Sequence, residues 1–137
     1  MQPIKKTFDE LNRVAIRYAA LKVLFSQFQL FLEEASKSLP VKGIVITTAS
    51  TTESEVEFLD KRYVISFFAE GGHGLIEFSN ARGVPSNAEP TQLALARFNG
   101  QGVLDLKQPA SEDEMNLKEE SCCINLLMNW LLQEAST

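Results

Sequence analysis

Apolar side chains recur at helical spacing through the first part of the chain. Residues Thr7 to Glu10 read Thr-Phe-Asp-Glu, a capping box in which the Thr hydroxyl accepts a hydrogen bond from the Glu amide. Pro40 removes the amide that a helix would need next, and no Gly or Pro stands between these signals. The pattern predicts a helix over residues 7–39. At ~1.5 Å per residue it would be about 50 Å long, which predicts a bend or an overhang.

This segment carries two apolar stripes. The broader stripe suits packing on a sheet and contains Val14, Tyr18, Leu21, Leu24, Phe25, Phe28, Phe31 and Leu32. The second stripe consists of Ile16, Val23 and Leu30, which repeat every seven residues. Such a repeat is typical of a helix that packs on another helix. It predicts an interface with a helix of this chain or of a second copy.

Residues 41–79 have the alternation and the turn signals of antiparallel strands. Residues 55–58 alternate Glu with Val or Phe, as expected for a strand with one face in water. Residues 63–68 are apolar on both sides, which predicts a central strand. Polar or glycine-rich segments at 60–62 and 71–74 predict turns, so this region should form a β-meander.

A long polar loop is predicted at residues 80–91, and the segment after it is ambiguous. Residues 92–98 are rich in Leu and Ala, a helical composition that Asn99-Gly100 could terminate. Asn-Gly is also a strong hairpin signal, and residues 103–106 would supply the partner strand. We favour the hairpin.

The C-terminal segment, residues 111–135, predicts a second helix. Residues Ser111 to Glu114 form another capping box. Its apolar residues make two opposite stripes: Met115, Cys122, Leu126 and Trp130 on one side, and Leu117, Ile124, Met128, Leu131 and Ala135 on the other. A helix that is apolar on two sides is either sandwiched within a domain or pressed against another molecule. Leu117, Ile124 and Leu131 therefore join the predicted helix interface, which either pairs the two helices or forms a homodimer.

Together these elements predict a single α+β domain over residues 1–137. It should contain a long N-terminal helix, an antiparallel meander of about five to six strands and a C-terminal helix, with both helices on one sheet face. A chain of 137 residues that is 45% hydrophobic and 23% charged can bury one core.

The distribution of charge and the position of the cysteines limit the partners and the cellular compartment that we expect. The net charge is −5 and the basic residues are scattered, whereas nucleic acids and anionic membranes attract clustered Lys and Arg; neither is a predicted partner. Cys122 and Cys123 are adjacent in a predicted helix, where a bridge between them would distort the backbone. The lack of a disulfide framework predicts a cytoplasmic protein. The uncharged run at residues 23–32 is shorter than the ~20 residues of a membrane span.

Candidate chemistry is sparse. His73 is the sole histidine, and the glycines around it are also what a tight turn requires. One His and an adjacent Cys pair match no familiar metal-ligand spacing, so neither a metal nor another cofactor is predicted. Glu55 and Glu57 fall on one strand face about 7 Å apart, which we interpret as a solvated surface.

Two functional hypotheses follow. The first is a binding or accessory protein without catalytic activity that acts through an apolar helix surface, alone or as a homodimer. A protein partner or a second copy is favoured over a small molecule. The alternative is a small-molecule-binding protein or modest enzyme with a cavity between sheet and helices. Its predicted lining is Tyr63, Phe67, His73, Phe78, Phe98 and Trp130.

Overall fold

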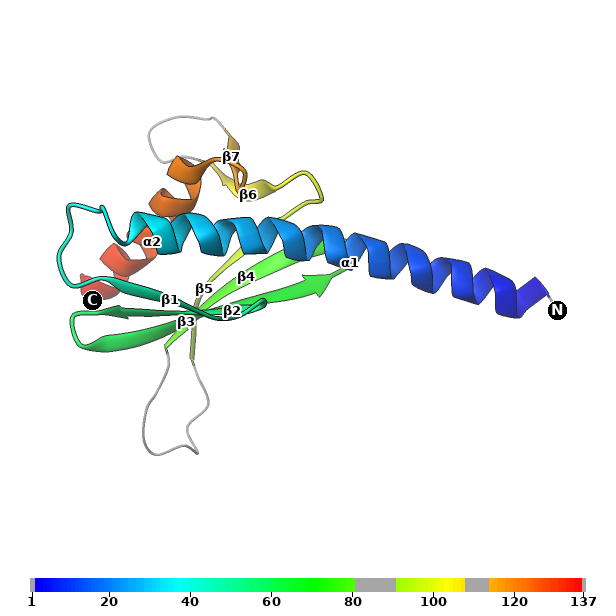
Figure 1. Cartoon of the computed structure of the whole chain (residues 1–137), viewed down its shortest axis with the longest axis horizontal. Helices are drawn as coiled ribbons and strands as arrows, with labels where there is room; N and C mark the ends of the chain where they lie inside the picture. Colours follow the sequence, from blue (N-terminus) through cyan, green and yellow to red (C-terminus); the bar gives the residue numbers. More distant parts are fainter. Residues whose placement is uncertain (1, 81–90, 108–113, 137) are drawn as a thin grey trace.

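The computed structural model describes residues 2–80, 91–107 and 114–136. Along the chain it contains α1 (Gln2–Ala35), β1 (Val45–Ser50), β2 (Glu53–Phe58), β3 (Lys61–Glu70), β4 (His73–Asn80), β5 (Thr91–Phe98), β6 (Val103–Lys107), β7 (Glu114–Asn116) and α2 (Glu120–Ala135). The strands form a seven-stranded antiparallel sheet in sequence order. The α+β class and the meander are confirmed (Figure 1). The strand beyond the expected five to six is the short β7.

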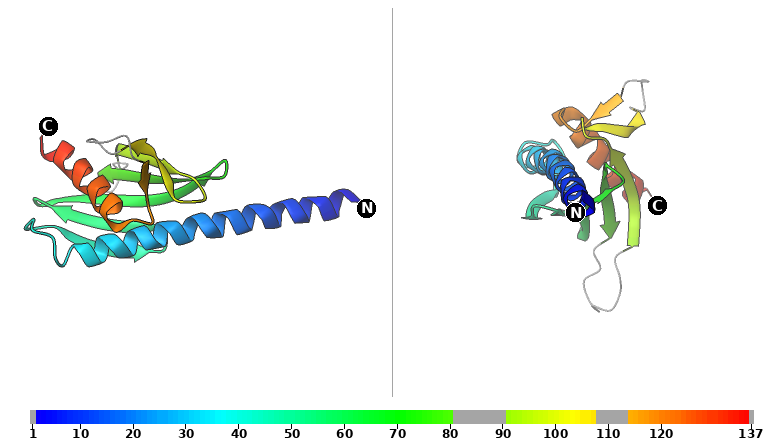
Figure 2. Two further views of the ribbon diagram at one scale, coloured as in Figure 1. Left: turned by 90° about the horizontal axis from the view of Figure 1, so that it is seen from above. Right: turned by 90° about the vertical axis from the view of Figure 1, so that its right-hand side faces the viewer.

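Both helices pack on one face of the sheet. The register pairs Ile65 with Phe78 and Phe67 with Ile76, so Phe67 and Phe78 point to the same side of neighbouring strands. Phe67 stacks on Phe25 of α1 at 5.4 Å between ring centroids, and Phe78 stacks on Trp130 of α2 at 5.3 Å. Figure 2 shows the two helices beside the sheet. The predicted arrangement is therefore confirmed.

The N-terminal helix differs from its predicted limits. α1 begins at Gln2 and ends at Ala35, so Thr7 lies inside the helix and the capping box predicted there is wrong. Nothing in the preceding residues breaks a helix, because a proline is tolerated in the first turn. At the other end, the Ser36 hydroxyl donates to the Glu33 carbonyl at 2.7 Å, within a turn that ends the helix before Pro40.

The second predicted helix start is also wrong. Residues Glu114–Asn116 form β7 beside β6, and α2 begins at Glu120; residues 111–113 of the predicted capping box lie outside the described residues. Met115 and Leu117 are buried on either side of Asn116, an alternation that belongs to a strand. The Asn116 side chain then accepts a hydrogen bond from the Lys118 amide at 2.9 Å and turns the chain toward α2.

The ambiguous segment after the predicted 80–91 loop is a strand, so the hairpin interpretation of residues 92–98 is confirmed. β5 pairs with β4 and meets β6 through Phe98 and Leu104. The Asn99 side chain shapes the turn by accepting hydrogen bonds from the Gln101 and Val103 amides at 2.9 and 3.0 Å. Of that predicted loop, residues 81–90 lie outside the described residues.

Neither α1 nor α2, the helices of the described residues, has the combination of length and hydropathy that a membrane-spanning helix needs.

Candidate functional site

The N-terminal helix divides into two halves where it leaves the sheet. Every side chain from Ile4 to Ala20 is exposed, and we call this segment the overhang. The other half packs on the sheet and buries Leu21, Leu24, Phe25, Phe28, Gln29, Leu32 and Ala35. Figure 1 shows the overhang projecting past the sheet as a straight continuation of the packed half.

One seven-residue repeat runs through both halves of α1. Its members are Ile4, Leu11, Tyr18, Phe25 and Leu32. Phe25 and Leu32 are 0% and 1% exposed, whereas Ile4 and Leu11 are 55% and 59% exposed. Residues seven apart in a helix are offset by only about 20° around its axis. Nearly the same face of α1 is therefore buried in the packed half and exposed to solvent in the overhang.

The uncovered face is wider than the repeat alone. Phe8 and Val14, each 60% exposed, lie beside it, and the whole set is defined here as the overhang stripe: Ile4, Phe8, Leu11, Val14 and Tyr18. The other sides of the overhang carry the exposed Ile16 and the charged residues Lys5, Lys6, Asp9, Glu10, Arg13 and Arg17. The overhang is therefore an amphipathic helix. Ile4, Phe8 and Leu11 provide a sequence signal for this stripe, whereas the predicted apolar stripe began at Val14.

A cleft of about 610 Å³ lies where the overhang departs from the sheet. One wall is α1 and the other is the β3–β4 turn, with a lining of Leu11, Val14, Ala15, Arg17, Tyr18, Leu21, Ala69, Glu70, Gly71 and Gly72. Gly71 and Gly72 have φ values of 57° and 81°, as a tight two-residue hairpin turn requires. A Cβ on Gly72 would come within 3.3 Å of Arg17 Nη1, so the guanidinium lies directly over this turn.

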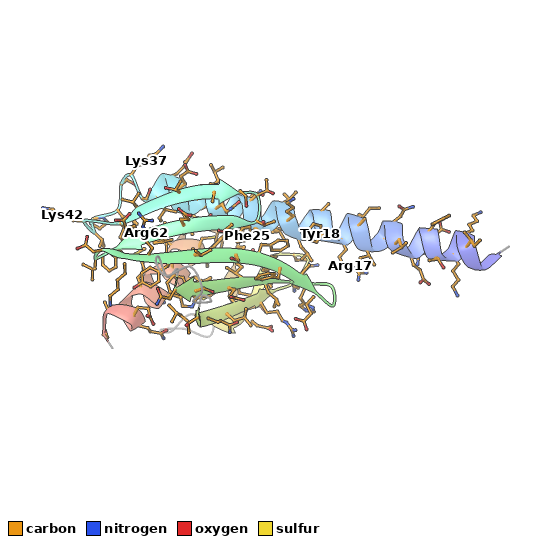
Figure 3. The ribbon with its side chains drawn as sticks, turned by 90° about the horizontal axis from the view of Figure 1, so that it is seen from below. Arg17, Tyr18, Phe25, Lys37, Lys42 and Arg62 are labelled. Atoms are coloured by element: carbon orange, nitrogen blue, oxygen red, sulfur yellow. The ribbon has the colours of Figure 1, made fainter. Side chains whose placement is uncertain are left out.

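Tyr18 marks the boundary between the two halves (Figure 3). Its ring centroid lies 5.7 Å from that of Phe67, and Lys22 Nζ lies 5.9 Å from the same ring, a distance compatible with a cation–π contact. The side chain is nevertheless 40% exposed. Tyr18 thus belongs both to the end of the core and to the overhang stripe.

The structure separates the residues of the predicted helix interface. Ile16, Val23 and Leu30 are 71%, 58% and 55% exposed and face away from the sheet, so a contact through them stays a prediction. Leu117 and Leu131 are buried in the domain's own core, and Ile124 is half-buried. Because their side chains are buried, Leu117 and Leu131 are not accessible to a partner in the folded domain.

The aromatic residues of the predicted cavity lie in the buried core. Tyr63 stacks on Phe78 at 4.9 Å, and Phe78 stacks in turn on Trp130. Phe67 contacts Phe98 at 6.2 Å, and each of these rings is at most 7% exposed. They line neither the cleft above nor a second, apolar cleft of about 300 Å³ formed by Val41, Ile44, Phe58, Met128, Leu131, Leu132 and Ala135.

His73 lies apart from these rings. It begins β4, is half-buried and has its Nδ1 3.3 Å from the Gly71 carbonyl oxygen. Within residues 2–80, 91–107 and 114–136, no group of three or more His, Cys, Asp or Glu is placed to hold a metal ion.

Burial keeps the Cys123 thiol and the Tyr63 hydroxyl in their neutral forms. Burial raises the pKa of Cys123 to about 12, and the neighbouring Cys122 and Glu120 add to the shift. The Cys123 thiol donates to the Leu117 carbonyl at 3.2 Å. Burial also raises the pKa of Tyr63, with a further contribution from Glu134. A protonated thiol in a core is a poor nucleophile.

Comparisons of the chain with protein-family models, with curated proteins and with solved structures found no match.

Proposed function

We propose that this chain is a binding protein whose functional surface is the overhang of α1. The occupant of that surface is the apolar face of a helix from another polypeptide chain. The observation that carries this proposal is the overhang stripe itself. It consists of five large, exposed apolar side chains along the part of α1 that extends beyond the sheet.

The fold of the domain does not account for the overhang stripe. Single exposed apolar residues are ordinary on protein surfaces, but a contiguous file of them marks an interaction site. Four of the five side chains are 55–60% exposed and Tyr18 is 40% exposed. Their free energy of transfer from water is therefore gained only when something covers them.

The shape of the stripe favours a helix as the occupant. A narrow apolar file with seven-residue spacing fits the seam of a helix pair, in which side chains of one helix insert between those of the other. A flat or globular contact would need apolar side chains over a broader arc, whereas charged residues occupy the far side of the overhang.

Site-specific photo-crosslinking in cells that make the full chain tests this proposal. A photoreactive amino acid at position 11 should give a discrete product with a polypeptide, because Leu11 is central to the stripe. The matched control is position 13, on the charged side of the same helix turn. Adding Phe8→Asp should abolish the product from position 11. Equal crosslinking from positions 11 and 13 would contradict the proposal.

A further inference from the structure

We infer that the helix covering the overhang stripe belongs to a second copy of this chain, with the two overhangs packed antiparallel and crossing at Leu11. This inference rests on the proposed function, because it names the partner of the same surface. It is carried by the symmetry of the stripe, by its area and by the open cleft beside Tyr18.

The spacing of the overhang stripe is self-complementary. Its members are separated by four, three, three and four residues, which reads the same in both directions from Leu11. In an antiparallel pair centred there, Ile4 of each copy meets Tyr18 of the other and Phe8 meets Val14. A two-fold axis requires one patch to match itself, and every member of this stripe finds another member.

The area is sufficient for a specific contact. Each side chain of the stripe offers on the order of 100 Å² of surface, given its size and its exposure. Two copies would then bury roughly 1,000 Å², which is about the lower limit for a specific interface. The cleft beside Tyr18 adds to this area, because the antiparallel arrangement brings the first turns of the second helix to it.

That cleft has room for side chains of the incoming helix. Its volume is about 610 Å³, more than that of a single side chain. Members of the stripe, Leu11, Val14 and Tyr18, line one wall, and the turn at Gly71 and Gly72 forms the other. The second copy thereby completes a cleft that one chain leaves open.

The charged side chains of the overhang leave the stripe free for this contact. Lys5, Lys6 and Arg13 point away from the stripe, so their charges stay in water in the antiparallel pair. At the cleft, the basic Arg17 and the acidic Glu70 are both part of the lining.

Mass measurement of the purified full chain gives the first test. By light scattering during size-exclusion chromatography, the wild type should have twice the mass of one chain. Leu11→Asp should reduce it to a single chain, with a dissociation constant raised roughly 100-fold or more, because two carboxylates would be buried face to face. The matched control Ile16→Asp, on the outward side of the same helix, should remain a dimer. A single-chain mass for the wild type would overturn the inference, as would dissociation by Ile16→Asp alone.

Disulfide mapping tests the orientation. Leu11→Cys should cross-link to itself, and chains carrying both Ile4→Cys and Tyr18→Cys should cross-link through these positions. Ile4→Cys alone should not, because antiparallel pairing places the two copies of position 4 about 21 Å apart, beyond disulfide reach. Cross-linking of Ile4→Cys alone would show a parallel pair and overturn the inference.

The outcomes separate this inference from the proposed function. A position-11 photo-crosslink to a chain of different mass would overturn the second copy as partner and leave the binding surface standing. A single-chain wild type that sediments with phosphatidylcholine–phosphatidylglycerol vesicles, with loss of sedimentation in Leu11→Asp, would assign the stripe to a membrane surface and overturn both.

Discussion

The two halves of α1 show how the same apolar pattern can serve different ends. Phe25 and Leu32 repeat at seven residues and close the core against the sheet, whereas Ile4 and Leu11 continue the repeat in solvent. The helix geometry is the same in both halves; only the presence of a sheet beneath it differs. An apolar stripe on a helix therefore indicates a packing partner. It does not indicate whether that partner is part of the same chain or of another molecule.

The largest expected difference between the halves is in stability. Phe28→Ala removes a ring that is 0% exposed and should lower the free energy of unfolding by about 3–5 kcal/mol. Phe8→Ala, measured at a concentration where the chain is dissociated, should change it by less than about 0.5 kcal/mol. Urea titration of both variants checks this, and similar losses would show that the overhang is packed within one chain.

A polar contact anchors the packed half and gives a smaller effect. The Gln29 side chain is 4% exposed and its Nε2 donates to the Ser50 carbonyl and the Ser54 hydroxyl, each at 2.9 Å. Gln29→Ala should lower the free energy of unfolding by about 1–3 kcal/mol, because the buried Ser54 hydroxyl and the part-buried Ser50 carbonyl lose their donor. Gln27→Ala, at an exposed site two residues away, is the matched control and should be nearly neutral in the same titration.

The boundary residue should behave between these two extremes. Tyr18→Ala removes the ring contact with Phe67 at 5.7 Å, and aromatic pairs contribute about 0.5–1.5 kcal/mol beyond burial. We expect a loss of about 1 kcal/mol in the dissociated chain and, separately, weaker dimerisation. Tyr18→Phe should keep both properties, and a variant that loses both would place the hydroxyl in the contact.

Thiol labelling compares a buried site in the core with an exposed site on the overhang. Cys122 and Cys123 are 0% exposed, and the pKa of Cys123 rises from 9.0 to about 12, so iodoacetamide at pH 8 should not label them in the folded protein. A cysteine introduced at exposed Ile16 should react readily. The unfolded Cys123 thiol loses its proton near pH 9 and the folded one only near 12, so the free energy of unfolding should fall as the pH rises through that range. Labelling of the native cysteines without unfolding would contradict their place in the core.

Much of the fold was predictable because local signals agreed with the global arrangement. Residues 63–68 are apolar on both sides and are followed by a glycine turn, and they form the centre of the sheet as expected. The helix starts predicted from the capping boxes at Thr7 and Ser111 were wrong, because such a motif can cap a helix but does not by itself decide where the helix begins. At the first, nothing breaks the helix upstream; at the second, Met115 and Leu117 alternate as a strand.

The site was only partly predictable. The length of the first helix predicted an overhang or a bend. The sequence of the helix, however, carries no information about where the sheet ends. The apolar pattern alone therefore could not distinguish Ile4 and Leu11 from core residues. Likewise, Tyr63, Phe78 and Trp130 could line a cavity or fill one, and their composition is the same in both cases. The structure shows that these rings are buried and contact one another, which the sequence does not reveal.

Hydrogen–deuterium exchange at varied protein concentration tests the central claim most directly. If a second copy covers the overhang stripe, the amides of residues 4–18 should exchange more slowly as the wild-type concentration rises, and those of Leu11→Asp should stay fast throughout. Exchange across residues 4–18 that is independent of concentration and identical in the two proteins would contradict the account.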